Sequence, residues 1–316
     1  PNVRLVLHGI AGSGPGDAWA VGENGVITHW NGREWRLDPY RAPGHLRAVW
    51  ATARNDVWAV GAGGLVVHFD GASWSVVPSQ TRVALRGVWS AGNGDVWIVG
   101  ESNVVMRREP ESPELRRVDP PEPHQWHDVS GAGPRDVWIV GDAGAILRWD
   151  GEAFRREPSG TGAALNAVWF GTAADGWIVG DVDEAADGPS AEAIAIHWDG
   201  RAFTRASTGT REPLLGVWGS GAGDVWAVGQ NFGRNPNRAR PVLHWDGNAW
   251  SPRSAGAAGW YAGVWGDGSG EVWAVGCCEP LIAWHLLEWR PVTRGSMIHA
   301  PDPPLPIGDG RIHRRW

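Results

Sequence analysis

The sequence predicts an all-β fold, a single seven-bladed β-propeller with four antiparallel strands in each blade. Three observations lead to this prediction: a repeat of about 40–50 residues, short apolar segments separated by Gly and Asp, and tryptophans that recur in register. Helical periodicity is absent from the whole chain. A four-stranded sheet cannot bury both of its faces alone, so the copies are expected to stack into a ring.

An acidic residue opens each Val-Trp-Ala-Val-Gly-like segment and gives the period. The seven residues are Asp17, Asp56, Asp95, Asp136, Asp175, Asp224 and Glu271, separated by 39, 39, 41, 39, 49 and 47 residues. The predicted blades lie near residues 5–40, 46–79, 85–118, 126–158, 165–206, 214–254 and 261–293. The propeller is therefore expected to occupy residues 1–289.

Each copy is predicted to contain four short strands, named A to D from the axis outward. In the second copy they are Leu46–Trp50, Val57–Val60, Leu65–Phe69 and Trp74–Val77. Gly and Asp gather at the breaks, as tight turns require.

Of the 24 tryptophans, 21 recur at equivalent strand positions. They are Trp50, Trp89, Trp169, Trp218 and Trp265 in strand A; Trp19, Trp58, Trp97, Trp138, Trp177, Trp226 and Trp273 in strand B; Trp30, Trp149, Trp198, Trp245 and Trp284 in strand C; and Trp35, Trp74, Trp250 and Trp289 in strand D. Each ring buries roughly 150–250 Å². These tryptophans are expected to form the core between blades rather than a surface for sugars.

The Gly-Asp-Val-Trp-Ala-Val-Gly segment at 223–229 and the His-Trp-Asp-Gly-x-x-Trp segment at 244–250 are each repeated along the chain. They resemble segments of bacterial Trp-rich β-propellers of the tectonin and kelch-like kind, over about Leu5 to Trp289. The Asp-Gly-x-x-Trp turn is also similar to a shortened Asp-box of sialidase-type and photosystem-assembly-factor propellers. These families include lectins, assembly factors and enzymes, so the resemblance implies an architecture and no particular chemistry.

Residues 290–316 depart from the repeat and form a Pro-rich C-terminal tail. The segment Ala300–Pro306 is expected to be extended, because its prolines cannot donate a full ladder of hydrogen bonds. The tail is predicted either to pack across the ring closure between the first and last blades or to lie on the surface.

Composition excludes some partners. The formal net charge is −7 and all 28 basic residues are arginines, which argues against a nucleic-acid partner. No apolar run approaches the ~20 residues that span a bilayer, so no membrane span is expected. Two adjacent cysteines do not fix the compartment. An extracellular or periplasmic location is slightly favoured over a cytoplasmic one. Whether a signal peptide has been removed stays an open question at this point.

One end of the ring is predicted to vary. In an antiparallel A-B-C-D meander, the B–C and D–A loops lie at one end and the A–B and C–D turns at the other. The turns at the second end are uniform. Insertions are expected at the first end, in Asp181–Glu192, Gln230–Arg240 and Pro110–Gln125. Insertions on one face of a repeat array usually mark a binding face, with tolerated surface variation as the alternative.

Two sets of polar residues are expected around the mouth of the central channel at this variable end. The second residue of each strand A is His8, Arg47, Arg86, His127, Asn166, Leu215 or Ala262. The residue after each strand-B Gly is Glu23, Ala62, Glu101, Asp142, Asp181, Gln230 or Cys277. We predict that Arg47, Arg86, Asn166, Glu23, Glu101 and Asp142 bind a polar ligand. Solvated or mutually paired charges are the alternative.

The first and fourth copies have His at the ring position and lack the strand-A Trp, having Ala11 and Ser130 instead. The missing ring is expected to free volume for a ligand or for another side chain. Trp126, Trp260 and Tyr261, which stand at strand-A starts, are further candidates for ligand binding. For Trp126 and Tyr261, packing in the core is the favoured alternative.

Metal binding and nucleophilic catalysis have candidate residues at the same end. His8, His124 and His127 are candidate Zn or Cu ligands, whereas His29, His68, His197 and His244 recur in strand C and are expected to be structural. Cys277 and Cys278 are predicted to form a vicinal disulfide or to stay as thiols. As a nucleophile, Cys277 would need a base such as His8.

The sequence thus favours a binding protein that recognises a polar ligand, namely a carbohydrate, a peptide or a protein partner, at the variable face and the channel mouth. The alternative is an enzyme, Zn- or Cu-dependent, with its active site at the same mouth and His8, His127 and Cys277 as candidate catalytic residues. A multivalent lectin should have equivalent polar sites in several blades, whereas these copies differ from one another at the mouth.

Overall fold

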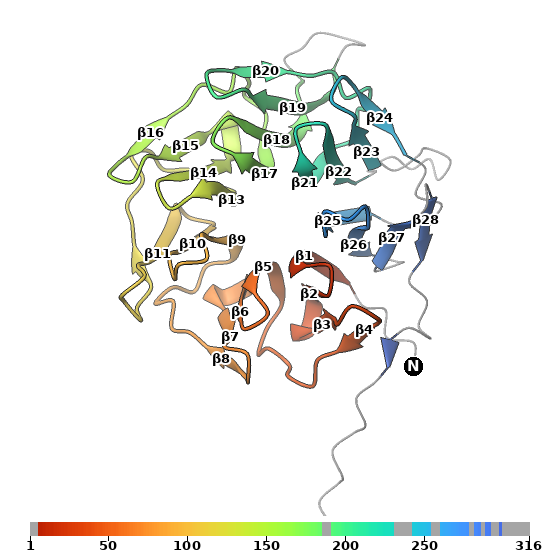
Figure 1. Ribbon diagram of the computed structural model, residues 1–316. Helices are drawn as coiled ribbons and strands as arrows, with labels where there is room; N and C mark the ends of the chain where they lie inside the picture. Colours follow the sequence, from red (N-terminus) through yellow and green to blue (C-terminus); the bar gives the residue numbers. More distant parts are fainter. Residues whose placement is uncertain are drawn as a thin grey trace, which may run out of the picture.

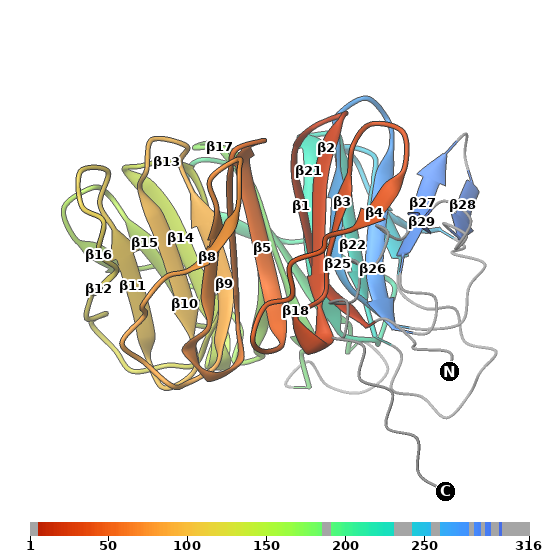
Figure 2. The same cartoon turned by 90° about the horizontal axis from the view of Figure 1, so that it is seen from below.

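The computed structural model describes residues 6–184, 191–230, 242–253, 260–277, 281–285, 288–291 and 297–298. Seven sheets are arranged around a central axis (Figure 1). In the perpendicular view, the inner strands run roughly along this axis, so that each sheet has one end at each of two opposite rims (Figure 2).

The sheets follow the chain, and we number the blades accordingly. Blade one contains β1 (Leu7–Gly14), β2 (Asp17–Gly22), β3 (Ile27–Trp30) and β4 (Trp35–Leu37); blade two contains β5 (Leu46–Ala53), β6 (Asp56–Gly61), β7 (Val66–Phe69) and β8 (Trp74–Val76); blade three contains β9 (Leu85–Ser90), β10 (Val96–Gly100), β11 (Val104–Arg108) and β12 (Arg116–Arg117). Blade four contains β13 (Trp126–Gly133), β14 (Asp136–Gly141), β15 (Ile146–Trp149) and β16 (Phe154–Arg156); blade five contains β17 (Leu165–Thr172), β18 (Asp175–Val182), β19 (Ala193–Trp198) and β20 (Phe203–Arg205). Blade six contains β21 (Leu214–Gly221), β22 (Asp224–Gly229), β23 (Val242–Trp245) and β24 (Trp250–Pro252); blade seven contains β25 (Trp260–Gly266), β26 (Val272–Cys277), β27 (Leu281–His285) and β28 (Glu288–Pro291).

Six of the described sheets, not seven, match the predicted blade of four antiparallel strands. Blade one has a fifth strand, β29 (Met297–Ile298), which pairs in parallel with β4 through Met297 opposite Trp35 and Ile298 opposite Arg36. The predicted number of four strands is therefore wrong for blade one. The physical reason is that an outer strand leaves one edge of its hydrogen-bonding groups without a partner, and a segment of the C-terminal tail pairs with that edge.

Two sequence-based boundaries also need correction. Strand A of blade two continues from the predicted Trp50 to Ala53, because its pairing with β6 extends to Ala53 opposite Asp56. The stretch Pro110–Gln125 was predicted as a D–A insertion, but it contains β12. Its first half is therefore the C–D connection of blade three, at the rim opposite to the predicted one.

The strand-B tryptophans join neighbouring blades. The Trp177 ring of blade five lies 4.8 Å from the Trp245 ring and 5.0 Å from the Trp250 ring of blade six. Trp273 of blade seven contacts Trp30 and Trp35 of blade one in the same way, at 5.9 and 6.4 Å, and so closes the ring. The strand-B tryptophans are at most 3 % exposed. Their predicted role in the core is confirmed.

Four of the strand-A tryptophans pack against glycine in the next blade, whereas the Trp50 indole donates to the Ser90 carbonyl. A Cβ added to Gly219 of blade six would lie 2.8 Å from the Trp169 ring of blade five, and one added to Gly266 of blade seven would lie 2.5 Å from the Trp218 ring of blade six. Glycine is therefore required by the close approach of an indole ring in these inter-blade contacts.

The rim that carries the A–B and C–D turns is held by a repeated hydrogen-bonded group, and we call it the uniform rim. The imidazole Nε2 of His29 lies 2.7 Å from Asp17, and His68, His197 and His244 make the same contact with Asp56, Asp175 and Asp224 at 2.7–2.8 Å. Arg107 and Arg148 replace these histidines in blades three and four and pair with Asp95 and Asp136. The predicted structural role of the four strand-C histidines is confirmed.

Candidate functional site

Seven equivalent residues near the start of the strands A line one opening at the other rim, which we call the mouth. They are His8, Arg47, Arg86, His127, Asn166, Leu215 and Ala262, around a cavity of about 230 Å³. Each follows directly on a D–A loop, so the meander places all of them at the same rim. The predicted convergence of these residues is confirmed.

Three mouth residues bond to the residue that follows the strand-B glycine of their own blade. Arg86 lies 2.8 Å from Glu101, His127 lies 2.9 Å from Asp142, and the amide of Asn166 donates to Asp181 at 2.7 Å. The antiparallel register explains these pairs, because the start of strand A faces the end of strand B in every blade. The alternative of mutually paired charges therefore holds for Arg86 and Glu101 in blade three, while blades four and five have hydrogen-bonded contacts at the same place.

Blades one and two differ from this pattern. Ala62 occupies the acidic position of blade two, and Arg47 is exposed and forms no ion pair with any described residue. The His8 ring stacks on the Trp260 ring, with centroids 5.9 Å apart and planes at 26°. Burial lowers the pKa of His8, while Glu23 opposes this shift and Arg47 and His45 add to it. Burial thus favours the neutral imidazole of His8.

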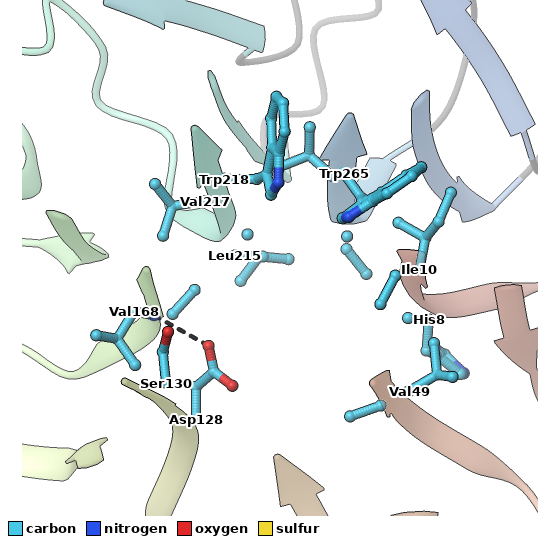
Figure 3. A pocket seen from close by; sticks show the side chains of 18 of the residues that line it. His8, Ile10, Val49, Asp128, Ser130, Val168, Leu215, Val217, Trp218 and Trp265 are labelled. Carbon is cyan, nitrogen blue, oxygen red and sulfur yellow. Dashed lines mark hydrogen bonds between the residues drawn. The ribbon is translucent and has the colours of Figure 1, made fainter. Parts of the chain in front are cut away.

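A second cavity of about 170 Å³ shares the mouth residues and continues along the strands A (Figure 3). The residue that follows each mouth residue is Gly or Ala in six blades, namely Gly9, Ala48, Gly87, Ala167, Gly216 and Gly263. In blade four it is Asp128, whose side chain lines the cavity. The sequence-based prediction missed Asp128 as a site residue, although alignment of the seven copies would have singled it out.

The Asp128 carboxylate is held between two blades. Its Oδ1 accepts a hydrogen bond from the Val129 amide at 2.9 Å, and its Oδ2 accepts one from the Val168 amide of blade five at 3.0 Å. Burial raises the pKa of Asp128 to about 7, and the two amides oppose that shift. The side chain keeps partial access to water from the channel. No described cation lies within ion-pair distance of it.

The volume freed by the missing Trp of blade four is filled by the protein itself. Phe170 of blade five stands where blades six and seven have Gly219 and Gly266, and its ring stacks on Trp138 of blade four at 4.6 Å and 10°. Ser130 is buried, and its Oγ accepts a hydrogen bond from the Phe170 amide at 3.3 Å. The sequence predicted that the freed volume would hold either a ligand or another side chain. Between blades four and five, another side chain fills it.

The candidate metal ligands do not form a metal site within the described part of the chain. No group of three or more His, Cys, Asp or Glu side chains there has the arrangement to hold a metal ion. His8 and His127 stand on blades one and four and are engaged with Trp260 and Asp142. His124 lies 3.5 Å from Glu122 and packs against Trp126. These contacts disfavour the predicted Zn or Cu set.

Two of the predicted aromatic contacts to a ligand are wrong. Trp126 and Tyr261 are both 0 % exposed, because they occupy the inward-facing first or second position of strand A. The favoured alternative, packing in the core, is confirmed for both. Trp260 is partly exposed at the mouth and remains a candidate.

The cysteine and insertion predictions are only partly covered by the structure. Cys277 ends β26 opposite Trp260, whereas Cys278 lies outside the described residues. Residues 185–190 of the first insertion and 231–240 of the second also lie outside them. The vicinal disulfide and the nucleophilic role of Cys277 therefore stay predictions.

No protein-family model matches the chain, and no curated protein matches it significantly. Among solved structures, it is similar to YCF48 bound to D1 peptide, with a TM-score of 0.67, 14% identity, and coverage of 89% of this chain and 93% of that one. It is also similar to the WD40 β-propeller domain of Doa1, with a TM-score of 0.68, 10% identity, and coverage of 93% and 97%. The extracellular domain of the two-component system BT4673 from B. thetaiotaomicron has a TM-score of 0.65 at 13% identity; the match covers 89% of this chain and 38% of that one. At these identities the similarity shows the β-propeller fold.

Within the described residues, no helix is long and apolar enough to cross a membrane.

Proposed function

We propose that this protein is an interaction propeller that binds a peptide segment of a partner protein at the mouth. The observation that carries the proposal is the ring of seven converging positions, at which the blades present His, Arg, Asn, Leu or Ala around one opening. A peptide offers different groups along its length, so a ring of different residues suits it better than a repeated sugar unit does.

The size of the mouth supports a peptide rather than a folded ligand. A cavity of about 230 Å³ is smaller than the roughly 300–1,000 Å³ of sites for drug-sized molecules. It has room for one or two side chains, while the rest of a partner would lie on the rim. Arg47 has donors that no described residue engages in an ion pair, and these suit carbonyl or carboxylate oxygens of a peptide.

The comparison with YCF48 adds support, because that propeller is described as bound to a D1 peptide. The peptide of that structure is not proposed as the ligand here. A carbohydrate or another small polar ligand has no comparable support.

Selection from a random peptide display library tests the proposal. Enriched peptides are synthesised, and their affinities are measured by fluorescence anisotropy for the wild-type protein, Arg47→Ala and Leu215→Trp. Leu215→Trp fills part of the mouth without changing its charge, so it should weaken binding at least tenfold. Arg47→Ala should weaken binding at least tenfold, because charge-assisted hydrogen bonds are worth about 1.5–3 kcal/mol and about 1.4 kcal/mol corresponds to a factor of ten.

Arg135→Ala provides the matched control. Arg135 is an exposed arginine beside the A–B turn of blade four, and its side chain is 74% exposed at the uniform rim. This variant should bind as the wild type does. The proposal fails if no peptide is enriched, or if enriched peptides bind Leu215→Trp and the wild type equally.

The metal-dependent enzyme has a separate test. Elemental analysis of protein purified without chelator should find stoichiometric Zn or Cu if that alternative holds, and His127→Ala should then lose the metal.

A further inference from the structure

The channel differs from its seven-fold pattern at one level, where blade four places Asp128 among glycines and alanines. Because the equivalent residues of the other blades are small, the cavity stays open beside the carboxylate (Figure 3). The fold does not need an acid here, as six blades form without one. Burial of a carboxylate costs free energy unless a partner compensates for it.

The carboxylate is only partly satisfied by the protein. A carboxylate has about four acceptor sites, and the Val129 and Val168 amides occupy two of them. The remaining sites are free to accept donors from the channel. The cationic side chains that line the cavity do not pair with Asp128: Arg86 on β9 pairs with Glu101, and Arg47 on β5 forms no ion pair with any described residue. His127 on β13 contacts Asp142, and the neutral Asn166 on β17 bonds to Asp181.

Further carboxylates lie just outside the cavity lining. The arginine and acidic side chains that line the two cavities are Arg47, Arg86 and Asp128. Behind them, Glu101, Asp142 and Asp181 contact Arg86, His127 and Asn166. Asp128 is thus a carboxylate that faces the cavity itself.

We infer that the channel beside Asp128 is a subsite for a primary ammonium group, which a lysine side chain or the N-terminus of the bound peptide inserts through the mouth. This inference rests on the proposed function and names the chemistry of the ligand. The cavity of about 170 Å³ equals the volume of roughly five or six waters, enough for an unbranched alkylammonium chain. Ser130, two residues along β13, lines the same cavity with its hydroxyl.

An ammonium ion at this position has a thermodynamic signature. An opposite charge nearby favours the ionised carboxylate, so the pKa of Asp128 falls from about 7 when the cation binds. Near pH 7 the complex should therefore release a fraction of a proton to the buffer. A neutral ligand of the same shape does not cause this release.

The first test uses n-butylammonium chloride, with n-butanol as the neutral control. The side-chain carboxyl ¹³C shift of Asp128 is followed by NMR as a function of pH. We expect n-butylammonium to lower the Asp128 pKa by at least half a unit and n-butanol to leave it unchanged. An unchanged pKa at saturating n-butylammonium would overturn the inference, whether or not any peptide binds.

The second test uses peptides enriched by the wild-type protein. Replacement of a critical lysine by norleucine, or acetylation of a critical N-terminus, should weaken binding at least tenfold, and these two changes distinguish the two sources of the ammonium group. Calorimetry in two buffers of different ionisation enthalpy should show proton release with the wild type and none with Asp128→Asn.

Two variants and one control separate binding from folding. Asp128→Asn keeps the shape, and Asp128→Ala restores the residue of blades two and five; both should weaken binding of the basic peptide about tenfold at pH 8 and less at pH 5.5. Asp199→Asn, in a uniform-rim turn where blade one has Asn31, should bind as the wild type does. If peptides bind Leu215→Trp weakly but bind Asp128→Ala as tightly as the wild type, the ammonium subsite is refuted. The proposed function is then still supported.

Discussion

Blade three carries an arginine–carboxylate pair at each of its ends, and the two pairs differ in environment. At the uniform rim, Arg107 donates to both oxygens of Asp95 at 2.8 and 2.9 Å, with side chains 19% and 1% exposed. At the mouth, Arg86 and Glu101 are 2.8 Å apart and 35% and 33% exposed. The Arg107 guanidinium also lies over the Trp97 and Trp149 rings at 5.0 and 5.4 Å.

This difference explains why one rim is uniform and the other varies. The Arg107–Asp95 pair, with its carboxylate 1% exposed, cannot lose one partner without a large cost, and an acidic residue recurs at the position of Asp95 in every copy. A half-exposed pair is screened by water and contributes little, so the mouth residues can change with the ligand. The repeated rim stabilises the ring, and the mouth is free to differ.

The largest effect should come from Asp95→Ala. It removes both hydrogen bonds of the partly buried Arg107 guanidinium to Asp95 and leaves it only Glu109 at 3.9 Å, which should cost about 3 kcal/mol of the free energy of unfolding. Urea denaturation followed by circular dichroism measures this loss. A loss below about 1 kcal/mol would remove the proposed distinction between the rims.

Asp128→Asn should stabilise the protein in a pH-dependent way. The folded pKa of about 7 lies above the usual 3.8, so between these values the folded state binds a proton that the unfolded chain does not. Stability of the wild type therefore falls as pH rises from about 4 to 7 and then levels off. The variant should gain up to about 4 kcal/mol above pH 7 and almost nothing near pH 4. Melting temperatures of both proteins at pH 4, 6 and 8 measure this; an equal difference at all three contradicts it.

Gly219→Ala should lower the free energy of unfolding by about 1–3 kcal/mol. The reason is that the new methyl group meets the Trp169 ring at 2.8 Å and the Asp224 carbonyl at 3.0 Å. Gly221→Ala is the control two residues along β21, since a Cβ there meets nothing within 4 Å. The two melting temperatures are compared. Equal melting temperatures would mean that the inter-blade contact is loose.

The smallest effect should come from Glu101→Ala at the mouth. Removal of the partner of Arg86 should change the free energy of unfolding by less than about 1 kcal/mol, because both side chains are about one-third exposed. The same urea denaturation as for Asp95→Ala measures it. A cost close to that of Asp95→Ala would show that the mouth has a structural role.

Residues within one blade were predictable from the sequence. The repeat fixes the register of strands A and B, so the mouth ring from His8 to Ala262 and the structural role of His29 follow from position alone. These contacts are local, and every copy repeats the same information.

The sequence predicted that tryptophans pack between blades, but how the blades fit together where the repeat is broken was decided only by the tertiary structure. The sequence shows that Ser130 replaces a Trp, but only the packed ring shows that Phe170, forty residues later, fills the space. The sequence also shows that Asp128 stands at a position where the other copies have small residues. It does not show that this side chain lies in the channel with a pKa near 7. The physical reason is that the repeat specifies each blade separately, whereas burial and charge in the channel depend on all of the inner strands together.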